Sequence, residues 1–433
     1  MRGFKSLFSI ILAVVFLSSV QSYADTFVVT NLNDSGEGSL RQAINTSNLV
    51  LGPDEIVFEE GLEGTIVLNL GQFDISDDLN INGPGADMLT IDADDSSRIF
   101  NISDGSTDTD ILVSISGLMF INGLSGGGAI LNFEDLSIDS CVFEGNSAIQ
   151  AGGVIFNKEG STIAEITNST FSGNNAESGG VIFNEEGTIQ NITNSTFNGN
   201  NSAGRGGGID NEGTIENITN STFSGNSAED GGAIYNDGDI NISFTTIANN
   251  EASAGGGIFE DRDSINIRNS IVAFNSPNNC VGPVNDLTGN WSNESSCGFL
   301  GDNSEIILGP LADNGGPTET MALLGGDPID GATNNCDALN EMGNPSGIPI
   351  GIDQRYFPRP FGVRCDSGAF EEGEVPQPQP PMNKGGGSCG VDVLPEGGGL
   401  ASIAPVRANN PIPLYFFIPV LILIRRIVKR CRS

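Results

Sequence analysis

Two short motifs recur along the middle of the chain, and their spacing predicts the fold class. FSGN at Phe171–Asn174 and GGVI at Gly179–Ile182 return as FNGN with GGGI, and again as FSGN with GGAI. The runs between them, such as GTIQNITNSTF, are rich in β-branched residues, which is typical of short strands. A repeat of about 25 residues predicts an all-β protein, a right-handed parallel β-helix of about ten turns with a cap at each end.

Each repeat contributes one apolar residue, followed three residues later by an asparagine. The apolar column is Met119, Phe143, Phe171, Phe197, Phe223, Ile247 and Val272. The asparagine column is Asn122, Asn146, Asn174, Asn200, Asn226, Asn250 and Asn275. Equivalent residues of a parallel solenoid lie above one another at roughly 4.8 Å, so we expect the apolar column to stack inside and the asparagines to form a ladder at a bend.

The remaining repeat positions predict the other bends. Asparagine tolerates left-handed backbone at a sharp corner, and Gly-Gly suits a corner where a Cβ would clash. Beyond each Gly-Gly lies a second asparagine column, made of Asn157, Asn184, Asn211 and Asn236. One such unit cannot bury its own apolar side, whereas stacked units can. We therefore assign residues 117–277 to regular β-helix repeats.

The N-terminal part divides into an export signal and the start of the solenoid. In residues 1–24, Arg2 and Lys5 precede the apolar run Leu7–Leu17, and small residues at positions 22 and 24 suit cleavage before Asp25. A retained apolar helix is the alternative. We expect residues 25–116 to form the N-terminal cap and the first turns. GSLRQAI at residues 38–44 predicts a short amphipathic helix that closes the open end.

The composition changes after residue 277, where the repeats end. Residues 278–373 contain Cys, Pro, Gly-rich turns and the sole tryptophan, Trp291, and are predicted to be a C-terminal cap module. Residues 374–410 form a Pro/Gln/Gly-rich linker that contains Cys389. Residues 411–433 combine an apolar segment with a basic end.

The repeats and the N-terminal segment resemble known exported proteins. The FxGN and GG(A/V/G)I motifs recur in phase over about residues 117–276 and resemble the chlamydial polymorphic outer-membrane protein repeats, which are parallel β-helices on bacterial surfaces. TFVVTNLNDSGEGSLRQAI followed by DEIVF resembles the start of CSLREA-type exported proteins, with Gly38 and Gln42 where Cys and Glu are usual. Both resemblances imply export.

The region after the repeats resembles the choice-of-anchor Q module found on such β-helices. The matching segments are IVAFNSPNNC, LGPLADNGGPTETMALLGGDPID, DQRYFPRP and CDSGAFE, with departures at Met321 and Tyr356, where His and Gly are more usual. The module implies surface display without naming an activity. Its spacing implies a cap tied by disulfides, with Cys336 paired to Cys365 and Cys280 paired to Cys297.

The tail resembles the tripartite C-terminal sorting signals of Gram-negative bacteria. A Gly-rich motif with Cys389 precedes an apolar segment and a basic end, and basic residues stay cytoplasmic. The resemblance implies that the segment holds the chain in the membrane until a sorting protease cuts near Cys389, a candidate for sorting or lipid anchoring. A permanent transmembrane anchor is the alternative, although about fourteen apolar residues, interrupted by Pro413 and Pro419, are short for a span.

The charge balance limits the partners and cofactors. The 433 residues include 55 acidic and 18 basic side chains and no histidine, giving a formal net charge of −37. Such a chain repels phosphate, so nucleic acid is not an expected partner. Without histidine or a CxxC pair, a zinc site is disfavoured. No cofactor is expected, although acid-rich turns such as Asn236–Asn241 predict weak calcium binding.

No catalytic residue is predicted from the sequence. Polysaccharide lyases and hydrolases of the parallel β-helix type are the alternative class, but they need cations beside a base or two suitably spaced carboxylates. Acids and arginines converge at Asp353, Arg355, Arg359, Arg364 and Asp366. This group either binds an anion or a sugar, or braces the loop-rich cap through Asp–Arg pairs, and we favour the bracing interpretation.

The export signal, the repeats and the anchoring tail together predict where the protein acts. We expect it on the cell surface or outer membrane of a Gram-negative bacterium, or outside the cell, acting as an adhesin-like or structural binding protein. The expected partners are a surface glycan or a host or matrix protein. We also expect the C-terminal segment to contact the membrane before processing and a sorting protease to act on it.

Overall fold

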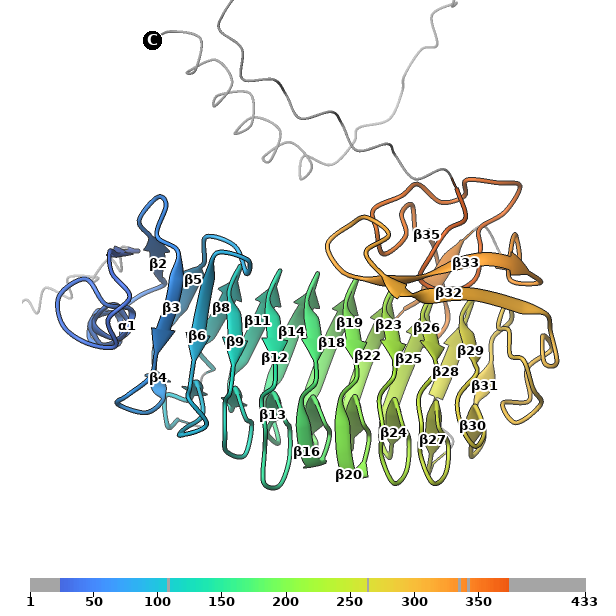
Figure 1. Ribbon diagram of the computed structural model, residues 1–433, viewed down its shortest axis with the longest axis horizontal. Helices are drawn as coiled ribbons and strands as arrows, with labels where there is room; N and C mark the ends of the chain where they lie inside the picture. Colours follow the sequence, from blue (N-terminus) through green and yellow to red (C-terminus); the bar gives the residue numbers. More distant parts are fainter. Residues whose placement is uncertain (1–23, 107–109, 263–264, 334–335, 341–342, 374–433) are drawn as a thin grey trace, which may run out of the picture. The chain divides into compact units, whose positions relative to one another are not determined.

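The computed structural model describes residues 24–106, 110–262, 265–333, 336–340 and 343–373. Within these residues the chain is all-β apart from one helix, and three long parallel sheets wind into a β-solenoid of about ten turns (Figure 1). Apart from Ala24, the predicted signal peptide lies outside the described residues, as do the linker with Cys389 and the apolar tail. No helix in the described part of the chain is long and apolar enough to cross a membrane.

Each turn of the solenoid passes through sheets I, II and III in that order. Sheet I consists of β1 (Thr26–Val29), β2 (Asp54–Phe58), β5 (Leu79–Asn82), β8 (Leu112–Ser116), β11 (Asp135–Asp139), β14 (Thr162–Thr167), β18 (Thr188–Thr193), β22 (Thr214–Thr219), β25 (Asp239–Ser243), β28 (Ile265–Arg268) and β31 (Asn285–Asp286). Sheet II consists of β3 (Gly64–Val67), β6 (Leu89–Asp92), β9 (Met119–Ile121), β12 (Val142–Glu144), β15 (Thr170–Ser172), β19 (Thr196–Asn198), β23 (Thr222–Ser224), β26 (Thr246–Ala248) and β29 (Ile271–Ala273).

Sheet III completes each turn. It consists of β4 (Phe73–Ile75), β7 (Phe100–Ile102), β10 (Ile130–Asn132), β13 (Ile155–Asn157), β17 (Ile182–Asn184), β21 (Ile209–Asn211), β24 (Ile234–Asn236), β27 (Ile258–Glu260) and β30 (Cys280–Val281). Two loops between sheets II and III also pair, as β16 (Asn175–Ser178) and β20 (Asn201–Arg205). Every strand thus lies beside its equivalent in the next turn, as a repeat of fixed length predicts.

Columns of equivalent apolar side chains fill the interior. The inward column of sheet II is Ile66, Ile91, Phe120, Phe143, Phe171, Phe197, Phe223, Ile247 and Val272, all of them buried. Successive ring centroids from Phe120 to Phe223 are 4.4 to 5.1 Å apart. Fully burying one such ring stabilises a fold by about 1.5–3 kcal/mol, so this column is a major part of the core.

The first member of both predicted columns was wrong by one residue. Val142 pairs with Met119 and Phe143 pairs with Phe120, so Phe120 is the buried stack member and Met119 is partly exposed. Asn122 lies outside the ladder: its Nδ2 donates to Asp92 Oδ1 at 2.9 Å. Adjacent residues of a strand point to opposite faces, and a motif alignment cannot separate two neighbouring apolar residues.

The other asparagines of the first column form a buried ladder at the bend between sheets II and III. It consists of Asn146, Asn174, Asn200, Asn226, Asn250 and Asn275. At one rung, Asn200 Oδ1 accepts from the backbone N–H and from Nδ2 of Asn174, both at 3.0 Å, and Asn200 Nδ2 donates to Phe171 O at 3.0 Å. The left-handed backbone here belongs to the preceding glycine, as at Gly173 (φ 63°).

The second asparagine column also forms a ladder, at the bend after sheet III. Successive amides join Asn132, Asn157, Asn184, Asn211 and Asn236, and the last donates to Glu260 Oε2 at 2.9 Å. The Gly-Gly corner between the two ladders is tight, because a Cβ on Gly180 would lie 2.1 Å from Gly207 O. These buried amides are hydrogen-bonded, which is the condition for polar groups inside a fold.

Helix α1 (Leu40–Ser47) lies at the N-terminal end of the solenoid. Leu40 and Ile44 are buried in the core, and the side chain of Ser39 caps the helix by accepting from the backbone N–H of Gln42. The helix begins two residues after the predicted start, because Gly38 has a φ of 77° and Ser39 is extended. Asp34 fixes the helix from outside through a 2.7 Å ion pair with Arg41.

The parallel pairing continues past residue 277, since β30 and β31 join sheets III and I. An antiparallel hairpin of β32 (Ile306–Ala312) and β33 (Thr320–Gly326) follows, and then a smaller one of β34 (Asp337–Leu339) and β35 (Pro345–Pro349). The disulfides Cys280–Cys297 and Cys336–Cys365 confirm the predicted pairing. Phe299 packs with Cys280 and Cys297 against the solenoid core, so this region closes the C-terminal end.

Candidate functional site

The C-terminal module lies against the outer face of sheet II, over β19, β23 and β26 (Figure 1). The first residue of each of these strands is a threonine whose hydroxyl bonds to the module. The bonds are Thr196 Oγ1 to Glu319 O at 2.6 Å, Thr222 Oγ1 to Gln354 Oε1 at 2.7 Å, and Ala369 N to Thr246 Oγ1 at 3.0 Å. This threonine column is therefore the docking strip for the module.

Gln354 is the centre of that contact. Its side chain is fully buried, and its Nε2 donates to Thr196 Oγ1 at 2.9 Å and to Thr318 Oγ1 at 2.8 Å. Thr318 in turn donates to Asn194 O at 3.0 Å. One amide thus joins the module to two successive turns of the solenoid, although these residues lie more than a hundred positions apart in the chain.

The predicted Asp–Arg group lies mostly inside the module. Arg355 forms a 2.6 Å ion pair with Asp353, and Arg359 forms a 3.0 Å ion pair with Glu371, with side chains 0–1 % exposed. Burial lowers the pKa of Arg359, and burial raises the pKa of Glu371. Side chains that solvent does not reach cannot meet a ligand, so the geometry favours bracing over binding.

The two remaining members of the group behave differently. Both carboxylate oxygens of Asp366 accept backbone N–H groups, from Asp330 at 2.7 Å and from Glu372, and burial raises the Asp366 pKa. Arg364 is exposed, and its backbone N–H donates to Asp330 Oδ1 at 2.7 Å. The sequence placed Arg364 with the other arginines, but its guanidinium is not buried with them.

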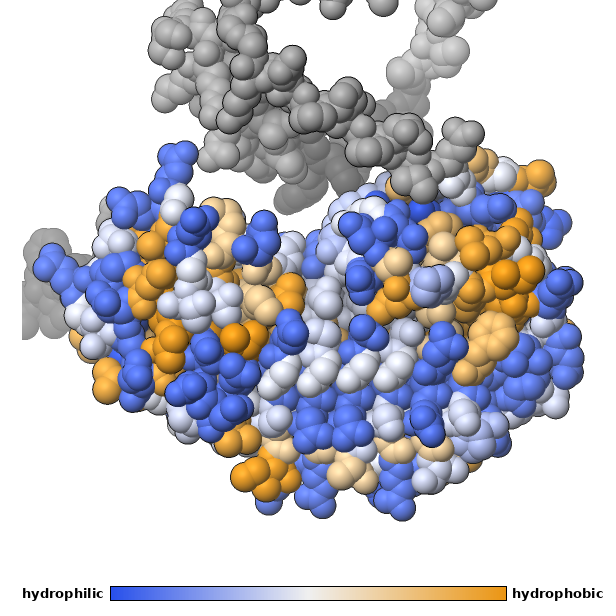
Figure 2. Space-filling model, viewed as in Figure 1, coloured by the Kyte–Doolittle hydropathy of each residue, from blue (hydrophilic) through white to orange (hydrophobic). Residues whose placement is uncertain are grey.

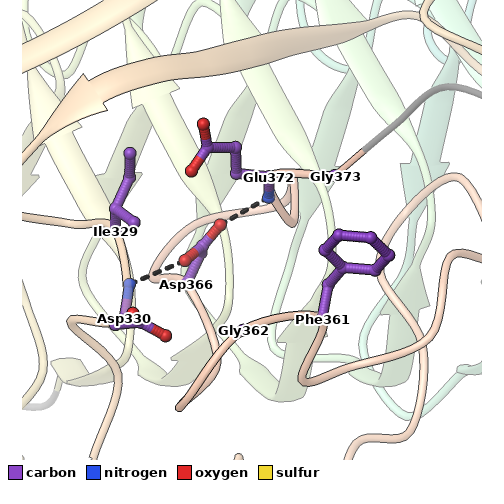
Figure 3. A pocket seen from close by; sticks show the side chains of 7 residues that line it. All are labelled: Ile329, Asp330, Phe361, Gly362, Asp366, Glu372 and Gly373. Carbon is purple, nitrogen blue, oxygen red and sulfur yellow. Dashed lines mark hydrogen bonds between the residues drawn. The ribbon is translucent and has the colours of Figure 1, made fainter.

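A pocket of about 480 Å³ opens next to this group (Figure 3). Its lining is Ile329, Asp330, Phe361, Gly362, Asp366, Glu372 and Gly373. Phe361 is 58 % exposed and faces the Asp366 carboxylate across the pocket. An exposed ring opposite carboxylates suits a neutral or cationic ligand with hydroxyl or ammonium donors, and it disfavours an anion.

A second unusual site, which sequence reasoning missed, lies on the outer face of sheet III. The middle residues of β13, β17, β21, β24 and β27 form an outward row of Phe156, Phe183, Asp210, Tyr235 and Phe259. Asp210 is 1 % exposed, and neither of its carboxylate oxygens has a hydrogen-bond partner among the described residues. The available signal was the D of GGGID, where neighbouring repeats have an aromatic residue.

The surroundings of Asp210 favour the protonated form of its carboxyl. Burial raises its pKa to about 7, the charge of Glu212 adds to this rise, and the nearby Arg205 and Ser178 oppose it. The Arg205 guanidinium lies 4.6 Å from the Tyr235 ring centroid and 3.6 Å from Glu212 Oε1. A carboxyl that titrates near neutrality is a feature of catalytic acids, but Asp210 lacks the access that a substrate needs.

The acid-rich turns near Asp210 form a pocket of about 460 Å³, lined by Glu186, Glu212, Gly213, Thr214, Asp237, Gly238, Asp239 and Arg262. Asp237, from the turn expected to bind calcium weakly, is paired with Arg262. In the part of the chain that the structure describes, no three His, Cys, Asp or Glu side chains are placed to hold a metal ion.

Figure 2 shows hydrophobic side chains over both ends of the described unit and mostly hydrophilic ones between them. Large exposed apolar residues of the first turns include Leu49, Leu51 and Leu70, and those near the C-terminal end include Leu300 and Val363. The middle turns present polar columns instead. Sheet I, for example, has Thr162, Thr188 and Thr214 in register and partly exposed.

Comparison with known proteins agrees with this architecture. Residues 140–158 and 220–237 match the family described as Chlamydia polymorphic membrane protein (Chlamydia_PMP) repeat. The first segment contains β12 and β13, and the second contains β23 and β24, so each match covers one passage from sheet II to sheet III. No curated protein matches the chain. The protein is a β-helix repeat protein with repeats like those of that family, which points to the surface or the outer membrane.

Proposed function

We propose that this protein is an adhesin-like or structural binding protein displayed on the surface of a Gram-negative bacterium. The observation that carries the proposal is the polar outer face of sheet I, where Thr162, Thr188 and Thr214 repeat in register. Equivalent hydroxyls one strand spacing apart, roughly 4.8 Å, offer many identical weak contacts, which suits a repetitive glycan or an extended matrix protein.

The sequence resemblances support export and anchorage. The CSLREA-like start and the signal pattern of residues 1–24 agree with secretion, and the choice-of-anchor Q-like module agrees with display. The sorting-signal resemblance assigns cleavage near Cys389 to a sorting protease. Cys389→Ala should leave full-length protein in the inner membrane, as fractionation and immunoblotting would measure. An unchanged surface yield would rule out this route.

Binding is tested with cells that display the full chain and with cells that lack it, on glycan arrays and on immobilised host and matrix proteins. Thr188→Tyr, in the middle of the sheet I face, should weaken binding at least about tenfold. Glu251→Tyr, at an exposed loop position away from that face, should leave binding intact. If displaying cells bind nothing more than the cells without the protein, the adhesin-like function is wrong.

The alternative is a polysaccharide lyase or hydrolase. It needs an accessible acid and base, and its best acid, Asp210, is 1 % exposed. Turnover of pectic, alginate or glycosaminoglycan substrates in the presence of calcium would establish this class, and loss of that turnover in Asp210→Asn would assign the site.

A further inference from the structure

The N-terminal edge of sheet I contains a buried carboxylate that is only half hydrogen-bonded. Asp54, the first residue of β2, is 0 % exposed. Its Oδ1 accepts the backbone N–H of Asp25 at 3.1 Å, whereas its Oδ2 is buried and has no hydrogen-bond partner in the described residues. Burial raises the Asp54 pKa, so its ionised form lacks sufficient stabilisation as the chain stands.

The charged groups around Asp54 destabilise its ionised form further. Asp25 itself, Asp77 before β5, and Glu55, whose Oε2 accepts from Thr26 Oγ1 at 3.4 Å, are all acidic. The Asp25 nitrogen is held in place, because Glu55 N donates to Asp25 O at 2.8 Å and β1 pairs with β2 from Thr26 onwards. The site therefore has a fixed nitrogen, an acceptor without a donor and no neutralising cation among these neighbours.

We propose that the Ala24–Asp25 bond is the processing site and that Asp54 is the acceptor for the ammonium group which cleavage creates. A signal peptidase hydrolyses the peptide bond with one water. The Ala24 carbonyl carbon gains the water oxygen and becomes a carboxylate, and the Asp25 nitrogen becomes a protonated amine. That ammonium group has three N–H donors and a positive charge, whereas the uncleaved amide has one N–H donor and no charge.

The new ammonium supplies what Asp54 lacks. It forms where the nitrogen is already 3.1 Å from Oδ1, so a second N–H can reach Oδ2 with little rearrangement. Removing the signal then stabilises the first pairing of the solenoid, β1 with β2. The inference rests on the signal pattern of residues 1–24 and on this geometry, and it is independent of what the surface binds.

The first experiment identifies the mature N-terminus. Mass spectrometry or N-terminal sequencing of the exported protein should give Asp25 as the first residue, and any other first residue overturns the assignment.

The second experiment compares the mature protein with a matched form that keeps two extra residues before Asp25. An α-amine has an ordinary pKa of about 8, and a carboxylate partner raises it in the folded state, so the stabilisation is present below about pH 8 and lost as the pH rises through the folded pKa. In urea unfolding at pH 7, the mature form should have a folding equilibrium constant at least about tenfold larger, and this advantage should shrink above pH 9.

Asp54→Asn should abolish the difference between the two forms, whereas the exposed Asp74→Asn should preserve it. If Asp54→Asn does not fold, the wild-type comparison alone decides. Equal stability of the mature and extended wild-type forms at pH 7 overturns the role of Asp54.

Discussion

The raised pKa of Asp210 predicts how the stability of the protein depends on pH. Its folded pKa is about 7 against an ordinary 3.8, a rise of about three units. For an acid, a raised folded pKa means that folding favours the protonated form. The stabilisation is complete below pH 3.8, decreases as the unfolded chain ionises, and is gone once the pH passes about 7. At 1.36 kcal/mol per unit, the total is about 4 kcal/mol.

Asp210→Asn removes this titration while keeping the size of the side chain. We expect the free energy of unfolding of the variant minus that of the wild type to increase by about 1.4 kcal/mol per pH unit between pH 4 and 7. Above pH 7 the difference should level off. Urea unfolding followed by circular dichroism at one-unit intervals measures both proteins, and the subtraction removes the contribution of the many other carboxyls.

Asp239→Asn is the matched control, because Asp239 is exposed at the start of β25. Its difference from wild type should stay within about 0.5 kcal/mol over the whole pH range. The absolute offset at pH 4 is not diagnostic, since a buried amide also lacks partners. If the Asp210→Asn difference is flat from pH 4 to pH 8, the carboxyl is solvated or paired in solution and the reasoning fails.

Three further changes test the core and the docking strip. Phe197→Ala removes a ring from the inner stack and should lower the free energy of unfolding by about 3–5 kcal/mol in urea, and a loss below 1 kcal/mol would mean that the stack is not tightly packed. Asn200→Ala orphans buried ladder groups and should cost about 2–5 kcal/mol, whereas its exposed neighbour Asn201→Ala should cost about 0.5 kcal/mol, and equal costs would contradict the ladder. Gln354→Ala should loosen the module, so that amide hydrogen exchange around Thr222 becomes faster; unchanged protection would show that Gln354 is not the central contact.

The solenoid could be predicted because stacked turns make one-dimensional spacing into three-dimensional contact. Phe171, Phe197 and Phe223 recur at a fixed interval and stack with rings 4.4 to 4.7 Å apart. The prediction failed where the repeat is weakest, at Met119 and Phe120. Both residues are apolar there, and only the pairing of β9 with β12 decides which one faces inward.

The docking of the module could not be predicted, because its contacts join residues that no local pattern relates. Phe244 shows why. The corner after sheet I has left-handed backbone at Asn168, Asn194, Asn220 and Asn269, a conformation that asparagine tolerates, and Phe244 takes the same corner with a φ of 48°. A bulky residue is strained there, so the sequence alone gives no reason for a phenylalanine at this bend.

The module supplies that reason. Phe244 is fully buried, packs with Ala332, Cys336 and Cys365, and lies under the Arg359 guanidinium at 4.6 Å. Burying an aromatic ring and pairing it with a cation offset the backbone strain of about 1–3 kcal/mol. Phe244 therefore anchors the disulfide of the module to the solenoid.

Phe244 and Asp210 share a property that bears on where function lies in this protein. Each lies in a column whose other members the repeat predicts. Phe244 departs from its column at the cost of backbone strain, and Asp210 departs from its column at the cost of a buried carboxyl that has no hydrogen-bond partner among the described residues. A repeat position needs no special explanation, because the neighbouring turns supply its environment. A costly departure persists where something outside the repeat compensates for it, as the module does for Phe244. Within the described residues, the nearby Arg205 and Ser178 compensate for Asp210 only in part, and the pH dependence of stability measures the free-energy cost that remains.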